Sequence, residues 1–282
     1  MRHAVTRQLN ALGAETTVEP HAGCRAGQIA QPDRPMTNRE IADALLSGRP
    51  DVSLPTCRAV AGAYAMVCVA APAVTAAELE QVFLRRTGNH TLCRLTDGGG
   101  QVLVPAATAT EAHAKCQRVV AELGKRSWLA MIHRPVCDLP AGRELVENIL
   151  TAAVALQRTG LCTPSDVMVE FAAASTPSVA AELTAVIQPV IANRILRQTL
   201  EALVAADGNR ARAAKDLIIH RSTIDYRLRR IEQLTGHCPT SLRGLTALSA
   251  ALVAHALKAR NDAACIRPTS RNDLDGSGSH NA

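Results

Sequence analysis

The stretch ILRQTLEALVAADGNRARAAKDLIIHRSTIDYRLRRIEQLTG, residues 195–236, decides the fold of the C-terminal part of the chain. In its first segment apolar residues recur at helical spacing. They are Ile195, Leu196, Leu200, Leu203 and Val204. A helix with such a stripe must bury it against other helices. We expect the helix to end at Asp207-Gly208, because glycine readily adopts the left-handed conformation that follows a helix.

Two further helices follow at close spacing. Asn209 can cap a short helix over 210–216, whose alanines allow a close helix crossing. The next helix is predicted to begin at about 220–222 and to run to Leu234, with Gly236 as its stop. The connection between them is as short as the turn of a helix-turn-helix, roughly three to four residues.

The last of these helices has two opposite faces. Its apolar stripe, which we expect to face the first two helices, consists of Ile224, Leu228, Ile231 and Leu234. The opposite side carries Ser222, Tyr226, Arg229 and Gln233. Such donors can reach base edges and phosphates, so the pattern is typical of a recognition helix in the major groove of DNA. An ordinary amphipathic surface helix would show the same stripe with arginines opposite.

The excess positive charge of the chain lies in the same region. The formal net charge is +6. Residues 1–193 hold 17 Lys or Arg and 17 Asp or Glu, whereas residues 194–260 hold 12 and 5. A polyanion-binding surface requires such a local excess. A solvated basic helix face would have the same charge, so charge alone leaves both interpretations open.

Upstream, short apolar runs alternate with helical patterns, which predicts a mixed α/β layer. Capping boxes start two helices, one with Thr37 and Glu40 and the other with Thr75 and Glu78. Strands are predicted at 63–70, on both sides of a glycine-rich turn at 97–100, at 127–135 and at 166–172. The order is strand, helix, two strands, helix, strand, helix, strand. We expect one sheet with helices on one face.

The fold class is therefore predicted as α+β, with about two domains for 282 residues. A mixed α/β sheet domain over 37–175 precedes an all-α helix-turn-helix domain over 193–260. Residues 176–192 are predicted to form a helical connector. Residues 1–36 and 261–282 lack apolar periodicity and are predicted to be disordered tails.

The run GN, AAKDL, HRST and YRLRRIEQLTG, followed by SLRGLTALSAALVAHAL, resembles the C-terminal helix-turn-helix of the PucR and CdaR type of bacterial transcriptional regulators. The upstream element order resembles the GGDEF-like domain of that family, so the resemblance spans roughly residues 37–257. It implies a regulator that binds a double-stranded DNA operator as a homodimer on two half-sites. The rival interpretation is a basic adaptor that binds protein or nucleic acid without operator specificity.

The resemblance implies that the DNA-binding residues are His220, Arg221, Ser222, Thr223, Tyr226, Arg227, Arg229 and Arg230. Two positions depart from the family pattern. Ser222 stands where asparagine is expected, and Asp225 stands where a basic residue is usual. Base preference and phosphate affinity are therefore expected to differ. The Asp225 carboxylate can accept from cytosine or pair with Arg229 at i, i+4, and the spacing favours the pair.

The sequence carries no catalytic or metal-binding pattern. The DGGG run at 97–100 lacks the lysine of a phosphate loop and the paired carboxylates of an active GGDEF hairpin. His220, His237 and Cys238 have no partner at metal-ligand spacing. We therefore expect no enzyme activity, cofactor or metal. The α/β domain is predicted to be degenerate and to serve dimerisation or signal sensing, with a small-molecule effector left open.

The nine cysteines form no CxxC pair, which favours buried free thiols in a reducing compartment. The N-terminal MRHAVTRQLN lacks the apolar segment of a signal peptide. Residues 59–77 carry no charge, but their glycine, proline and many alanines favour a buried strand over a membrane span. We predict a cytoplasmic protein with no membrane contact.

Overall fold

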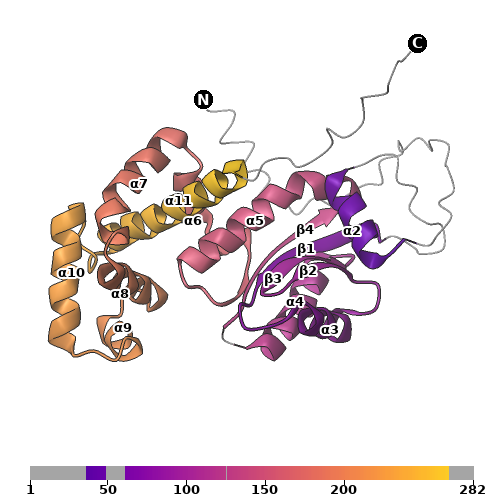
Figure 1. Ribbon diagram of the computed structural model, residues 1–282, viewed down its shortest axis with the longest axis horizontal. Coiled ribbons are helices and arrows are strands. Elements are labelled where there is room, and N and C mark those ends of the chain that lie inside the picture. The colour runs from indigo at the N-terminus through magenta and orange to yellow at the C-terminus, as the bar shows by residue number, and fades with distance from the viewer. Residues whose placement is uncertain (1–35, 49–60, 125, 267–282) are drawn as a thin grey trace, which may run out of the picture.

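The computed structural model describes residues 36–48, 61–124 and 126–266. In this part of the chain a sheet with helices on both faces lies beside a group of helices, and the long helix α11 runs from one to the other (Figure 1). The predicted tail at 1–36 lies outside the described residues, apart from Met36.

The sheet has five strands among the described residues: β1 (Ala63–Ala70), β2 (Leu92–Thr96), β3 (Gly99–Pro105), β4 (Trp128–Pro135) and β5 (Gly160–Cys162). Their order is β2-β3-β1-β4-β5, and all neighbours are antiparallel except β4 and β5. In the centre, Met66 of β1 lies opposite Leu103 on one side and Ile132 on the other.

The glycine-rich turn predicted at 97–100 is shorter in the structure, because only residues 97 and 98 lie between β2 and β3, and Gly99 and Gly100 belong to β3. A Cβ atom at Gly99 would lie 2.3 Å from the carbonyl oxygen of Val69, and one at Gly100 would lie 2.4 Å from that of Arg94. Only glycine therefore allows β3 to lie so close to both neighbouring strands. The Asp97 carboxylate accepts from the backbone N–H of Ala76 (2.9 Å) at the first turn of a helix, so the run has a structural role.

Both faces of the sheet are covered (Figure 1). The helices α2 (Asn38–Ser47) and α5 (Leu139–Ala155) pack on the face that carries Met66. The helices α3 (Ala76–Thr87) and α4 (Ala109–Leu123) pack on the face that carries Val67. The expectation of helices on one face was therefore wrong. The strand β1 is apolar throughout, and only a strand buried on both faces gains from such a sequence.

The predicted capping boxes and the predicted strand 63–70 are confirmed. The strand predicted at 166–172 was wrong, because these residues form the end of a 3₁₀ turn (Pro164–Asp166) and helix α6 (Met168–Ala174), and the last strand among the described residues is β5. Thr163 and Asp166 form a capping box that turns the chain away from the sheet. A short apolar run fits a strand or a helix equally well, so periodicity did not separate them.

The C-terminal helices are α7 (Pro177–Ile191), α8 (Arg194–Ala205), α9 (Arg210–Asp216), α10 (Arg221–Thr235) and α11 (Leu242–Ile266). The helix α7 lies in the predicted connector. The helix α11 continues to Ile266, which corrects the predicted start of the tail at 261, and residues 267–282 lie outside the described residues.

One hydrophobic core extends from the sheet into these helices. It joins Met66 of β1 and Ile149 of α5 to Ile187 of α7, Leu252 of α11 and Leu228 of α10. A polar contact adds to this connection, because Glu147 of α5 pairs with Arg260 of α11 (Nη1–Oε2, 3.5 Å). The two predicted domains therefore share a core on the α5 side of the sheet.

Among the described helices, none alone is long and apolar enough to cross a membrane. The pair α7 and α8 reaches that length and composition together, but it is bent by 118°.

Candidate nucleic-acid interface

Side-chain caps fix the ends of the first two helices of this region. The Asn193 side chain accepts from the backbone N–H groups of Ile195 (3.0 Å) and Leu196 (3.2 Å) and starts α8. Asn209 accepts from the N–H of Arg212 (3.1 Å) and starts α9, as predicted. Between them the chain turns at Asp207, which has a φ of 50°.

The predicted apolar stripe of α8 is confirmed except at its first residue. The buried residues include Leu196, Leu200, Leu203 and Val204. Ile195 is 53% exposed, so its predicted burial was wrong. It lies in the first turn of α8, on a side of the helix that does not face the core.

The apolar stripe of α10, which we call the seam, is buried as predicted. Ile224 and Ile231 are fully buried, Leu228 is 2% exposed, and Leu234 is half-buried at the end. The helix begins after His220, whose Nδ1 accepts from the backbone N–H of Ser222 (3.3 Å). It ends at Gly236, which has a left-handed φ of 72°.

The opposite side of α10 is exposed to solvent. We call it the polar strip, and it consists of Ser222, Tyr226, Arg229 and Gln233, all exposed. His220, Arg221 and Arg230 are exposed beside it. In Figure 1, α10 lies at the outer edge of the molecule, far from the sheet, so a long polymer can approach it. The facing that we predicted for this helix is confirmed.

Two of the residues expected to bind DNA lie elsewhere on the helix. Arg227 is half-buried, and its Nη1 lies 3.4 Å from Oγ1 of Thr199 on α8. Thr223 is also half-buried. Arg227 therefore joins α10 to α8, and it does not lie in the polar strip.

The Asp225 carboxylate has a different partner from the one expected. It pairs with Arg210 at the start of α9 (Nη1–Oδ1, 3.1 Å), whereas the Nε of Arg229 points to the backbone carbonyl of Asp225 (3.4 Å). The expected side-chain pair with Arg229 was therefore wrong. Sequence reasoning missed Arg210, because the contact depends on how α9 crosses α10.

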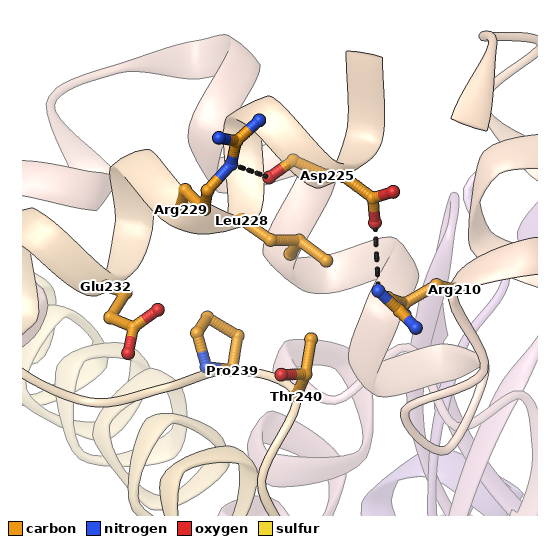
Figure 2. A pocket seen from close by; sticks show the side chains of 7 residues that line it. All are labelled: Arg210, Asp225, Leu228, Arg229, Glu232, Pro239 and Thr240. Atoms are coloured by element: carbon orange, nitrogen blue, oxygen red, sulfur yellow. Dashed lines mark hydrogen bonds and ion pairs between the residues drawn. The ribbon is translucent and has the colours of Figure 1, made fainter. Parts of the chain in front are cut away.

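A hollow of about 340 Å³ lies beside this ion pair (Figure 2). Its lining residues are Arg210, Asp225, Leu228, Arg229, Glu232, Pro239 and Thr240. Two cationic and two anionic side chains surround it, so it offers no net charge to a ligand. Among the described residues, no three His, Cys, Asp or Glu side chains lie close enough together to hold a metal ion.

The turn from α9 to α10 covers residues 217–220. Ile218 has a φ of 55°, and its N–H donates to the carbonyl of Lys215 (3.1 Å). The N–H of Ile219 donates to the carbonyl of Ala214 (3.0 Å), which completes a left-handed helix end. The sequence predicted a short connection at this place but not the left-handed backbone of Ile218.

A short helix, a four-residue turn and a longer helix with a bare polar face define a helix-turn-helix DNA-binding domain. Residues 196–254 match the family model of the PucR C-terminal helix-turn-helix domain. The expected resemblance is confirmed for this region, and the chain is a transcriptional regulator that carries a PucR-type helix-turn-helix.

Among solved structures, the chain is similar to the Regulator of Polyketide Synthase Expression from Bifidobacterium adolescentis. The identity is 19%, the match covers 78% of this chain and 92% of that one, and the TM-score is 0.40. No curated protein sequence matches the chain.

Proposed function

We propose that this chain recognises a specific operator sequence in double-stranded DNA, with α10 in the major groove. The observation that carries the proposal is the contrast between the two sides of α10. The seam through Ile224, Leu228 and Ile231 is buried, and the polar strip opposite is exposed. A helix held in this way presents its polar strip as a rigid unit, as base recognition requires.

The side chains of the polar strip suit base recognition. Arg229 can donate two hydrogen bonds to guanine, and Gln233 can both donate to and accept from adenine. Ser222 lies in the first turn of α10, the part of a recognition helix that reaches the base edges. We assign base contacts to the polar strip.

The exposed residues beside the strip suit phosphate contacts. We assign these contacts to His220, Arg221 and Arg230, because phosphate contacts need charge or donors but no fixed register with the bases. Arg227 and Thr223 are assigned a supporting role, since both are half-buried.

We further propose that the chain acts as a homodimer in the cytoplasm, and that the α/β part is a degenerate GGDEF-like unit for dimerisation or signal sensing. The shared core supports coupling between this unit and the helix-turn-helix, because α11 packs on α5, α6 and α7 while its own first half belongs to the matched family region. A small change in the sheet unit would reach α10 through α11 and α7, because α7 packs on both of these helices.

The test is a selection of binding duplexes from a random pool with the full chain, followed by fluorescence anisotropy over a range of salt. A specific regulator keeps an affinity gap of about 10³-fold or more between the selected duplex and a scrambled one at physiological salt. Arg229→Ala is expected to narrow this gap. A control, Arg118→Ala, removes an exposed cation from α4 and should leave it unchanged.

Two results would overturn the proposal. Equal affinity for selected and scrambled duplexes, with a steep loss on adding salt, would identify a non-specific basic adaptor. No binding to duplex DNA at low ionic strength would remove DNA as the partner altogether.

A further inference from the structure

The turn before α10 holds a residue that fits its backbone poorly. Ile218 adopts a φ of 55°, and it is the only β-branched residue with a left-handed backbone among the described residues. This conformation crowds the Cβ atom, so glycine or asparagine usually fills the position after a helix.

The chain builds the same helix end a second time with a more suitable residue. At the end of α8, Asp207 has a φ of 50° and donates to the carbonyl of Val204 (2.9 Å), and Gly208 donates to that of Leu203 (2.9 Å). Aspartate tolerates this backbone far better than isoleucine. The hydrogen bonds at the two helix ends are equivalent, so the turn itself does not require isoleucine at 218.

Packing does not require it either. Ile218 is 91% exposed, the highest value among the large apolar side chains of the described residues. The neighbouring Ile219 packs against the core and provides the apolar contact of this turn. An isoleucine that is both strained and almost fully exposed contributes nothing to the folded chain, and residues of this kind are concentrated at binding sites.

We propose that Ile218 is a further specificity-determining residue, whose side chain contacts the 5-methyl group of a thymine. The inference rests on the proposed operator binding. Ile218 lies two residues before the cap of α10, and the connection from α9 joins α10 at the end that begins the recognition helix (Figure 1). In the major groove an apolar side chain distinguishes thymine by its methyl group, which no hydrogen bond reads.

The experiment combines a protein change with a base change. The full chain and the variant Ile218→Gly are titrated with the selected duplex and with duplexes in which deoxyuridine replaces one thymine at a time. Deoxyuridine lacks only the methyl group. The wild-type chain should lose about three- to tenfold in affinity at one position, as expected for one lost methyl contact. The glycine variant should bind all these duplexes equally well.

Two control variants separate this contact from effects on the turn. Asp207→Gly places glycine at the equivalent helix end of α8 and should leave every affinity unchanged. Ile218→Val keeps a branched apolar side chain and should retain sensitivity to the methyl group. Ile218→Gly should also be at least as resistant to urea as the wild-type chain, because glycine removes the backbone strain at position 218.

The possible failures are distinguishable. If the wild-type chain shows no preference for the selected duplex, the operator proposal fails and this one with it. If the wild-type chain is specific but Ile218→Gly keeps the same sensitivity at every thymine, only the role of Ile218 is overturned. A glycine variant that unfolds more easily would show that Ile218 serves the fold, and would also overturn it.

Discussion

The strand β1 lies at the centre of the sheet, and the helix α10 is the main helix of the helix-turn-helix. They differ in how many of their sides are covered by other parts of the chain. In β1 all residues from Tyr64 to Val69 are buried, because helices lie on both faces of the sheet. In α10 the seam is buried, but the polar strip is exposed. The sheet uses all of its surface for stability. The helix uses one side for stability, and its other side stays exposed to solvent.

The comparison extends to chemistry. Among its described residues the sheet part holds four buried thiols, on Cys68, Cys93, Cys116 and Cys162, and burial raises the pKa of each to about 12. The helix-turn-helix instead exposes cations such as Arg221, Arg229 and Arg230. The buried thiols of the sheet part stay neutral near physiological pH, whereas the exposed side of α10 is rich in cations.

The largest effect is expected for a change in the seam of α10. Leu228→Ala should lower the free energy of unfolding by about 2–5 kcal/mol, because Leu228 is 2% exposed and its loss leaves a cavity. Urea denaturation followed by circular dichroism measures this change. Tyr226→Ala, which removes an exposed side chain two residues away, should stay within about 0.5 kcal/mol of the wild-type chain. The reverse order of the two effects would mean that the sides of α10 are inverted.

A smaller effect, on binding alone, is expected for Arg229→Ala. Loss of one base contact should cost about 1–3 kcal/mol of operator binding and relax the preference at one base pair. The free energy of unfolding should stay within about 0.5 kcal/mol, since Arg229 is exposed. Anisotropy titration against single-base variants of the selected duplex, with urea denaturation in parallel, tests both statements. Unfolding of the variant without any change of preference would contradict them.

The sheet part should respond to alkaline pH. A buried thiol has a pKa of about 12 in the folded chain, against 9.0 for an unperturbed cysteine, so the folded form stays protonated after the unfolded form has begun to ionise. The stabilisation is complete below pH 9 and is lost as the pH rises towards 12. At pH 10, one unit above the unfolded pKa, each of the thiols of Cys68 and Cys116 should cost about 1.4 kcal/mol of stability. The Cys116→Ala variant should show a weaker pH dependence between pH 8 and 10.5 in thermal denaturation, and an unchanged slope would refute this origin.

The smallest effect is expected at the ion pair between α9 and α10. A double-mutant cycle of Asp225→Asn and Arg210→Ala should give a coupling of about 0.2–1 kcal/mol, because both side chains are partly exposed. The matched cycle of Asp225→Asn with Arg229→Ala should give a value near zero, measured by the same urea denaturation. A larger coupling in the second cycle would show that Asp225 pairs with Arg229 within α10.

Local features of the chain could be predicted because they need only neighbouring residues. The capping boxes at Thr37 and Thr75 involve residues three positions apart, and the hairpin with its turn at Asp97 follows from the glycines beside that residue. The buried seam and the polar strip of α10 follow from helical periodicity, which fixes opposite sides without knowledge of what covers them.

Features that depend on contacts between distant segments could not be predicted. Residues 166–172 have no periodicity that separates a strand from a helix. In the folded chain β5 takes the place beside β4, and the residues that follow it form the helix α6. The partner of Asp225 depends on the crossing of α9 and α10. The exposure of Ile218 and the strain in its backbone depend on the hydrogen bonds that close the turn.

The amino-acid sequence by itself determined which helix of this protein has one buried side and one exposed side rich in arginine, because amphipathic periodicity and the concentration of arginines are properties of neighbouring residues. Tertiary structure alone decided that both faces of the sheet are covered, that α11 joins the two regions through one core, and which charges pair across helices. The reason is that burial and ion pairing depend on distances between segments far apart in the chain, and folding alone sets those distances.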